Sequence, residues 1–243
     1  VDMIFNFPNQ TREMLAEDIE RIKECAAQQV TFYPLMSAPS VQQSMANSIG
    51  KLTHDHEWEF FNLINDQLAG EFKPLSSWTF VRHSAGMIDE YIVDSDEYLG
   101  IGSGAFSYLN GSLFVNHFSI FQYIEELLQG KLPLNGQKTY NRQAQMRYWF
   151  MMNLFSTHFD RQAFKKRFNT SIWLGLGIEM LFMNLMGAFK SGDSSQLTRR
   201  GQYLSLVMMR EFFSGVNNLR DIARKNLSPL ELASATPVKK TSA

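Results

Sequence analysis

Apolar and polar positions along the first part of the chain follow the order strand, helix, strand. Residues 1–7 (VDMIFNF) form an apolar run with polar residues only at Asp2 and Asn6, and residues 30–36 (VTFYPLM) form a second apolar run. Between them, apolar residues recur at helical spacing, at Leu15, Ile19, Ile22 and Ala26. Two such runs joined by an amphipathic helix predict a βαβ unit with buried, parallel strands.

The ends of these strands indicate where a ligand would bind. Thr11 can cap the intervening helix, because its hydroxyl can accept a hydrogen bond from the first helical turn. Ligands of α/β folds bind at the carboxyl ends of parallel strands. If this unit has a site, we expect it at Asn6 and Phe7 and at residues 33–36.

The most unusual stretch runs from Asp94 to Asn116. It is rich in glycine early on, with Gly100, Gly102 and Gly104 close together. An Asn110-Gly111 pair then separates two short apolar runs, which is a strong signal for a tight β-hairpin. Because glycine adopts positive φ and allows a close approach of the backbone, we interpret the stretch as a glycine loop followed by a hairpin.

Three roles are open to the glycines. Gly100-x-Gly102-x-x-Ala105 satisfies the dinucleotide pattern, but that pattern requires a helix to begin at the glycines. The residues that follow predict a hairpin instead, so a nicotinamide or flavin site is not expected. The stretch is then either a structural turn or a ligand-facing loop at the end of a barrel or sheet.

The second half of the chain is helical. A helix over residues 119–129 is closed by Gly130, and residues 132–136 (LPLNG) are the best domain boundary. We predict two domains and a tail: residues 1–134, a helical domain at 135–226 with a winged-helix-like order of three helices and a small wing, and a flexible tail at 227–243. The apolar run 173–189 predicts a buried helix, because Glu179 and Asn184 interrupt it and it is short for a membrane span.

Charge and cysteine content narrow the function. The net charge is −1, and no recognition helix accompanies the basic residues at 165–167 and 199–200. We therefore expect no nucleic-acid partner. We also expect no membrane span. The one cysteine, Cys25, rules out an internal disulfide and a cysteine-ligated cluster within this chain, and it fits a reducing, cytoplasmic compartment.

His54-x-His56 is interpreted as a solvated helix start rather than a metal pair. The chain begins with Val1 and at once with a strand, so we expect it to start inside a larger fold.

Four motifs in order resemble one family. DMIFNFPNQT (2–11), VTFYPLMSAP (30–39), DEYLGIGSGAFSYLNG (96–111) and LTRRGQYLSLVMMREFF (197–213) are similar to segments of oxygen-independent coproporphyrinogen III oxidase-like radical SAM proteins. The family patterns are DLxxGLPxQT, the next barrel strand, DYLGLGxGAxS, and LTxxG before the last helix. The resemblance spans nearly the whole chain.

The resemblance implies an α/β fold: the C-terminal portion of a partial (β/α) radical SAM barrel, followed by a helical, winged-helix-like domain that caps it. In such proteins a 4Fe–4S cluster, held by a CxxxCxxC loop, cleaves S-adenosylmethionine to a 5′-deoxyadenosyl radical. That loop belongs to the N-terminal half of the family, and it is absent here. The resemblance therefore implies that this chain alone is inactive, and it assigns no metal ligand and no catalytic residue.

The matching positions imply a cofactor site and a substrate site. Asp2 matches the strand acid that contacts the nucleoside of S-adenosylmethionine, with pairing to a strand neighbour as the structural alternative. The adenine would be lined by Tyr33, Pro34, Leu35 and Met36. The loop that faces the radical or the substrate would be Gly102, Ser103, Gly104, Ala105 and Phe106. The sequence departs from the family at Asn6, where glycine is usual, and at Phe106, where histidine is common, which weakens the case for coproporphyrinogen itself as substrate.

Three functions follow as hypotheses. The first is a fragment of a radical SAM oxidoreductase or transferase that acts on a tetrapyrrole-like small molecule. The second is a haem-binding protein or haem chaperone of the same architecture, and the third is a scaffold whose catalytic half is lost. Because barrel strands without neighbours leave unpaired edges, we also expect another chain or a homo-oligomer to cover the open edge.

Overall fold

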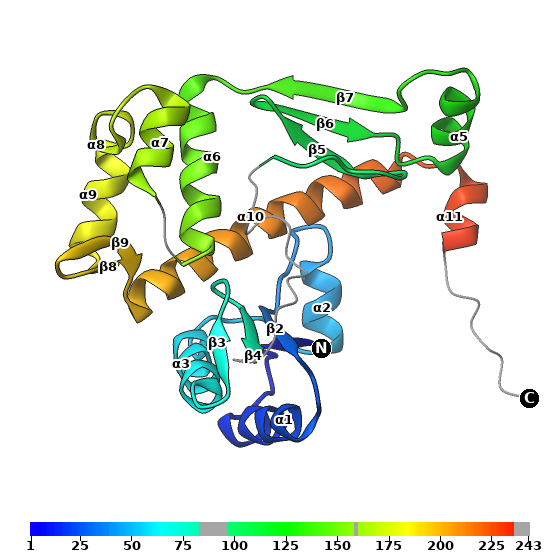
Figure 1. The fold of residues 1–243 in the computed structure, drawn as a ribbon. Helices are drawn as coiled ribbons and strands as arrows, with labels where there is room; N and C mark the ends of the chain where they lie inside the picture. The colour runs from blue at the N-terminus through cyan, green and yellow to red at the C-terminus, as the bar shows by residue number, and fades with distance from the viewer. Residues whose placement is uncertain (83–96, 158–159, 236–243) are drawn as a thin grey trace, which may run out of the picture.

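The computed structural model describes residues 1–82, 97–157 and 160–235, drawn as a ribbon in Figure 1. The first part contains β1 (Asp2–Phe5), α1 (Arg12–Glu24), β2 (Gln29–Pro34), α2 (Gln42–Ser48), α3 (Glu57–Leu68), β3 (Phe72–Pro74) and β4 (Thr79–Arg82). The middle contains β5 (Phe106–Leu109), β6 (Ser112–Asn116), α5 (Ile120–Leu128) and β7 (Leu134–Thr139). The last part contains α6 (Arg142–Phe155), α7 (Arg161–Phe168), α8 (Ile172–Gly175), α9 (Gly177–Leu185), β8 (Phe189–Lys190), β9 (Asp193–Leu197), α10 (Arg199–Lys225) and α11 (Pro229–Ala235).

The predicted βαβ unit is confirmed, because β1 pairs with β2 in parallel across α1. Thr11 caps α1 as predicted, since its hydroxyl accepts a hydrogen bond from the amide of Met14. The sheet continues in the order β1-β2-β4-β3, and both added pairings are antiparallel. The described residues thus form an open mixed sheet and no closed barrel.

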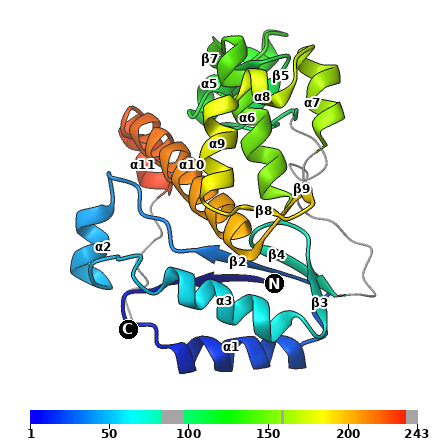
Figure 2. The same ribbon diagram turned by 90° about the vertical axis from the view of Figure 1, so that its left-hand side faces the viewer.

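Helices cover both faces of this sheet (Figure 2). On one side lie α1 and α3, and on the other lie α6 and α10. The core between these layers combines Phe5, Val30, Phe32 and Phe80 of the strands with Ile19, Ile64, Phe155 and Met209 of the helices. The first strand was predicted to be buried, but most of it is exposed, because among the described residues β1 is an edge strand with a neighbour on one side only.

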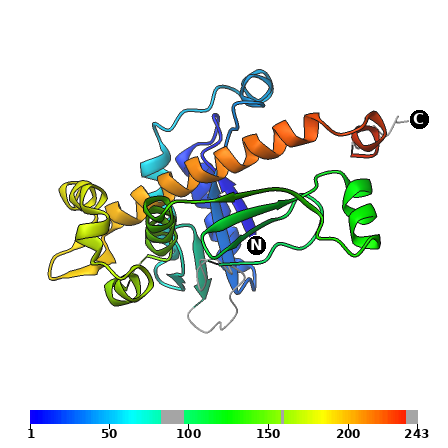
Figure 3. The same cartoon turned by 90° about the horizontal axis from the view of Figure 1, so that it is seen from above.

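The predicted hairpin is confirmed and forms part of a second sheet, β5-β6-β7. Asn110 and Gly111 connect β5 to β6 with φ of 49° and 74°, the left-handed conformation that this short turn requires. The sheet lies along α10 in two views (Figures 1 and 3). The domain boundary expected after residue 134 falls at the first residue of β7, which pairs with β6.

The helices of the last part pack around a second core. It joins Trp149 and Leu154 of α6 to residues of the following helices, among them Phe164, Ile172, Met180 and Met183. The β8–β9 hairpin precedes α10 at the place where a wing was expected. Residues 229–235, within the expected tail, form α11.

The prediction of one buried helix over 173–189 was wrong. The run is divided into α8 and α9, and only one side of α9 is buried. The pattern misled because its apolar residues occupy both sides of the helix, and within the described ranges only one side packs against other residues of the core. None of the helices in the described ranges is long and apolar enough to span a membrane.

Candidate functional site

The glycine loop is fixed against the hairpin and α5 by hydrogen bonds. The amide of Gly100 donates to Oγ of Ser107 at 3.0 Å, and the amide of Gly102 donates to the hydroxyl of Tyr123 at 3.1 Å. Nδ2 of Asn116 donates to the carbonyl of Gly102 at 2.9 Å. The loop therefore has a defined conformation that depends on β6 and α5.

The three glycines of the loop serve different purposes. A Cβ at Gly100 would lie 2.1 Å from the carbonyl oxygen of Phe106, and a Cβ at Gly104 would lie 3.0 Å from the ring of Phe118. Gly102 has φ of 107° and open space where a Cβ would be. Gly100 is thus required by packing against backbone. Gly104 has a φ of 68° and a ring close by, and Gly102 combines a positive φ with room beside it for a ligand.

The carboxyl ends of β1 and β2 form a second, more buried region. Asn6 is buried and has φ of 69°, which explains how it replaces a glycine, because Asn tolerates the left-handed conformation better than most residues. Its side chain donates to the carbonyl of Thr53 at 2.9 Å. Past the end of β2, Oγ of Ser37 is buried and has no hydrogen-bond partner in the described structure.

One turn of α10 contacts both regions. Oγ of Ser40, in the loop after β2, donates to Asp221 at 2.6 Å. The adjacent residue, Arg220, places its guanidinium over the ring of Phe106, 5.4 Å from the centroid. The segment after β2 and the glycine loop are far apart in sequence, and α10 brings them to one place.

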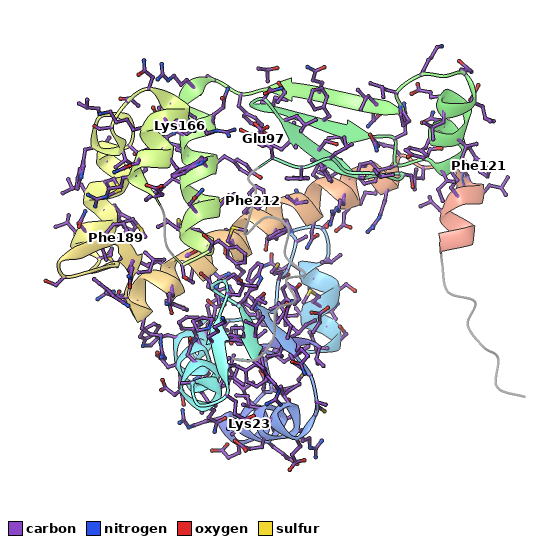
Figure 4. The ribbon with its side chains drawn as sticks, viewed as in Figure 1. Lys23, Glu97, Phe121, Lys166, Phe189 and Phe212 are labelled. Carbon is purple, nitrogen blue, oxygen red and sulfur yellow. The ribbon has the colours of Figure 1, made fainter. Side chains whose placement is uncertain are left out.

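A continuous series of aromatic rings also connects the two regions. Successive ring centroids lie between 4.3 and 6.3 Å apart, in the order Tyr33, Trp78, Phe213, Phe212, Tyr148 and Tyr108. Figure 4 labels Phe212 on α10 and Glu97 at the start of the glycine loop. The series packs the first sheet, α10, α6 and the hairpin against one another.

The sequence-predicted residues do not all come together. Asp2 pairs with Thr31 at the amino end of the parallel strands, whereas Pro34 pairs with Phe5 at the carboxyl end. The two positions are three steps apart along the strands, roughly 10 Å. Pro34 and Leu35 are buried, and Tyr33 and Met36 pack against the core. Of the loop residues, Phe106 contacts α10, and Ser103 is exposed.

Sequence reasoning missed a buried ionic cluster that joins α3 to α10. Glu57 is fully buried, and Arg210 donates to both of its carboxylate oxygens. The hydroxyl of Tyr203 donates to Glu57 at 3.2 Å, and Nδ1 of His54 lies 3.2 Å from Glu57. A faint signal was present in the sequence, because Arg210 interrupts the apolar side of the last helix directly after Met209.

The cluster shifts two pKa values. Burial, followed by the charge of Glu57, raises the pKa of Tyr203 to about 12. Burial alone would lower the pKa of Arg210, but the Glu57 carboxylate outweighs it, and the net pKa is raised. Both residues therefore keep their protons at neutral pH, and the cluster fixes α10 over the sheet as an ion pair with a neutral phenol.

A polar pocket of about 370 Å³ lies beside the glycine loop, between α5 and the end of α10. It is lined by His117, Phe118, Ser119, Gln122, Asn135, Ala223, Asn226, Leu227, Ser228 and Glu231. Nε2 of His117 lies 3.3 Å from Glu126. Hydrogen bonds from Ser119, and then from Ser228, lower the pKa of Glu231, so its carboxylate is ionised in this pocket.

The described residues do not fit an iron–sulfur cluster. Cys25 is an exposed residue at the end of α1, and no group of three or more His, Cys, Asp or Glu side chains in the described ranges could hold a metal ion. A cluster with cysteine ligands would need residues that this chain does not supply.

No protein-family model and no curated protein matches this chain. Among solved structures, the chain is similar to coproporphyrinogen III oxidase (HemN) from Escherichia coli, a radical SAM enzyme, with a TM-score of 0.63 and 14% sequence identity. The match covers 87% of this chain and 54% of HemN. The chain therefore has the fold of the matched part of HemN, as its motifs predicted.

Proposed function

We propose that this chain is part of a radical SAM enzyme that acts on a tetrapyrrole-like substrate. The observation that carries the proposal is the convergence of the loop after β2 and the glycine loop on one turn of α10, at Arg220 and Asp221. The sequence resemblance assigns the first of these segments to the cofactor and the second to the substrate, and the chain has the fold of part of HemN.

The proposed roles of the residues follow from their surroundings. Tyr33, which is half-buried and packs on the buried Trp78 with the two rings 5.3 Å apart, supplies apolar surface at the carboxyl end of β2 for an adenine. Gly102 leaves room for a ligand beside the loop. Asp2 lies at the amino end of β1, away from the carboxyl ends of the strands. Its proposed contact with a ribose requires the ligand to extend along β1 toward it. The cluster and its cysteines belong to a segment outside this chain, and so does the chemistry that they supply.

The open edge of β1 fits the same proposal. β1 pairs only with β2, so one row of its backbone groups has no strand neighbour among the described residues. Such an edge is a template for further pairing. We assign it to the remaining barrel strands, whether they come from the same protein or from another copy.

The test is cleavage of S-adenosylmethionine. The full gene product is reconstituted anaerobically with iron and sulfide, and 5′-deoxyadenosine is measured after addition of reductant. Formation of 5′-deoxyadenosine supports the proposal, and this chain alone is expected to form none. A full gene product that binds its cluster and still cleaves no S-adenosylmethionine would refute it.

Haem binding, which the sequence resemblance leaves open as the alternative, is the second candidate. Titration of the chain with haem distinguishes the two. A shifted Soret band with micromolar affinity, without cleavage by the full gene product, would favour a haem-binding protein. If the full gene product cleaves no S-adenosylmethionine and the chain gives no shifted Soret band, the scaffold hypothesis remains.

A further inference from the structure

One side of α9 and the adjoining α8 are apolar and exposed. Leu176, Met180 and Met183 face the core and are buried. The opposite side exposes six large apolar side chains, each between 47% and 84% exposed: Trp173, Leu174, Ile178, Leu181, Phe182 and Leu185. We call these six residues the α9 face. The last four lie at i, i+3, i+4 and i+7, the spacing of a helix-packing seam.

The α9 face lies at the upper end of the apolar patches that single proteins expose. Single exposed apolar residues are normal, but a contiguous patch of several hundred Å² marks an interaction site. At roughly 100 Å² for each side chain, the six expose on the order of 600 Å² of apolar surface. A specific dimer of standard size buries about 600 to 1,000 Å² on each partner. The α9 face alone approaches that area.

The charges of this region are compatible with a second copy of the same chain. In a two-fold symmetric contact the face meets itself, so any charge on it would lie near a like charge. Glu179 is the one charged residue between Trp173 and Leu185, and it lies off the seam. It is paired with Arg147, whose Nε lies 2.6 Å from its carboxylate. The face can therefore meet itself without repulsion.

The described ends of the chain lie away from this face. In Figures 1 and 3, α8 and α9 lie at one end of the molecule, Val1 lies near the middle, and α11 lies at the opposite end. A continuation of the chain from either place would have to cross the molecule to cover α9. A second copy reaches it directly.

We propose that the α9 face forms a two-fold symmetric dimer with a second copy of this chain, in which α9 packs antiparallel to its counterpart. In that arrangement Leu181 and Phe182 lie at the axis, and Ile178 of one protomer lies opposite Leu185 of its partner. The proposal is independent of the function proposed above, since it uses none of the residues of that site.

The experiment measures the mass of the full gene product by sedimentation equilibrium from 1 to 100 μM. The wild type is expected to be a dimer at the upper end of this range, and Leu181→Asp is expected to be monomeric throughout. The matched control is Leu128→Asp, on an exposed apolar side of α5 at the other end of the molecule, where Figure 4 labels the neighbouring Phe121. It is expected to remain dimeric. Circular dichroism confirms that each variant is folded.

Charge pairs test the antiparallel arrangement. Ile178→Lys and Leu185→Glu are each expected to weaken the dimer at least tenfold, because each buries an unpaired charge. The double variant is expected to recover most of the lost affinity, since the two new charges then face each other across the axis. A monomeric wild type, or a Leu181→Asp variant that still dimerises, would overturn the proposal. So would a monomer that floats with vesicles of phosphatidylcholine and phosphatidylserine, because the face would then bind membrane.

Discussion

The guanidinium of Arg220 lies over the ring of Phe106, and this contact joins the last long helix to the glycine loop. Within the described ranges, Arg220 forms no ion pair. Its neighbour on the helix, Asp221, is already bonded to Ser40 and paired with Arg224. A cation that is stacked on an aromatic ring and has no carboxylate partner is available to an anionic group of a ligand.

We predict that Arg220→Gln weakens binding of a porphyrin tetracarboxylate by about 10- to 100-fold, because a hydrogen bond to a charged group contributes about 1.5–3 kcal/mol. Binding of the uncharged methyl ester is expected to change little. Fluorescence titration of the wild type and the variant measures both affinities.

Arg224→Gln is the matched control, since it removes the same charge one turn further along α10, from an exposed residue that is paired with Asp221. Equal losses in the two variants would show that net charge, rather than the position of Arg220, determines affinity. If the wild type binds the ester as well as the tetracarboxylate, Arg220 does not contact an anionic group.

Gly100 is predicted to be essential for the hairpin. Gly100→Ala places a Cβ against the carbonyl of Phe106, a backbone atom that cannot move aside without disturbing β5. We expect a loss of about 1–3 kcal/mol in the free energy of unfolding, measured by urea denaturation. Gly136→Ala in β7 is the control, because nothing lies within 4 Å of its Cβ position. Similar midpoints for the two variants would contradict the packing role of Gly100.

The buried Glu57 is predicted to be the most sensitive charged residue of the interface between α3 and α10. Glu57→Ala leaves Arg210 buried with the exposed Glu211 as its one carboxylate partner among the described residues, and we expect a loss of about 3 kcal/mol. Glu59→Ala removes a carboxylate from the same helix that is paired with Arg12 at the surface, and we expect less than about 1 kcal/mol. Thermal and urea unfolding of both variants measure the difference, and equal losses would argue against the cluster as a link between the layers.

Stability at alkaline pH is predicted to depend on Tyr203. Its pKa is raised to about 12 in the folded chain, whereas an unfolded tyrosine titrates near pH 10. The folded state therefore holds the proton more tightly, so the contribution of Tyr203 is complete below about pH 10 and is lost as the pH rises from about 10 to about 12.

Tyr203→Phe removes this dependence and keeps the ring contacts with Trp58 and Phe61. Urea unfolding at pH 9 and pH 11 measures it. The wild type is expected to lose more stability between the two values than the variant. Identical pH dependence would show that the phenol is as accessible in the folded chain as in the unfolded one.

Local signals were sufficient for the elements that depend on neighbours in sequence. The βαβ unit follows from apolar spacing, the hairpin from Asn110-Gly111, and the end of α5 from Gly130, whose φ is 69°. Long-range pairings carry no local signature. The antiparallel addition of β3 and β4, and the contact of Glu57 with Arg210 across 153 residues, could not be inferred from spacing. The exposed side of α9 was missed because an apolar residue looks the same whether its partner belongs to its own chain or to another.

Because α10 lies near the end of the chain, the fold can be completed only late in synthesis. At 27 residues it is about 40 Å long, and it contacts the sheet, α6 and the hairpin. During synthesis, the earlier elements leave the ribosome while this helix is still missing. The loop after β2 and the glycine loop can then meet only after residue 221 has been made. A chain that is shortened before α10 keeps every glycine of the loop and still cannot assemble the site.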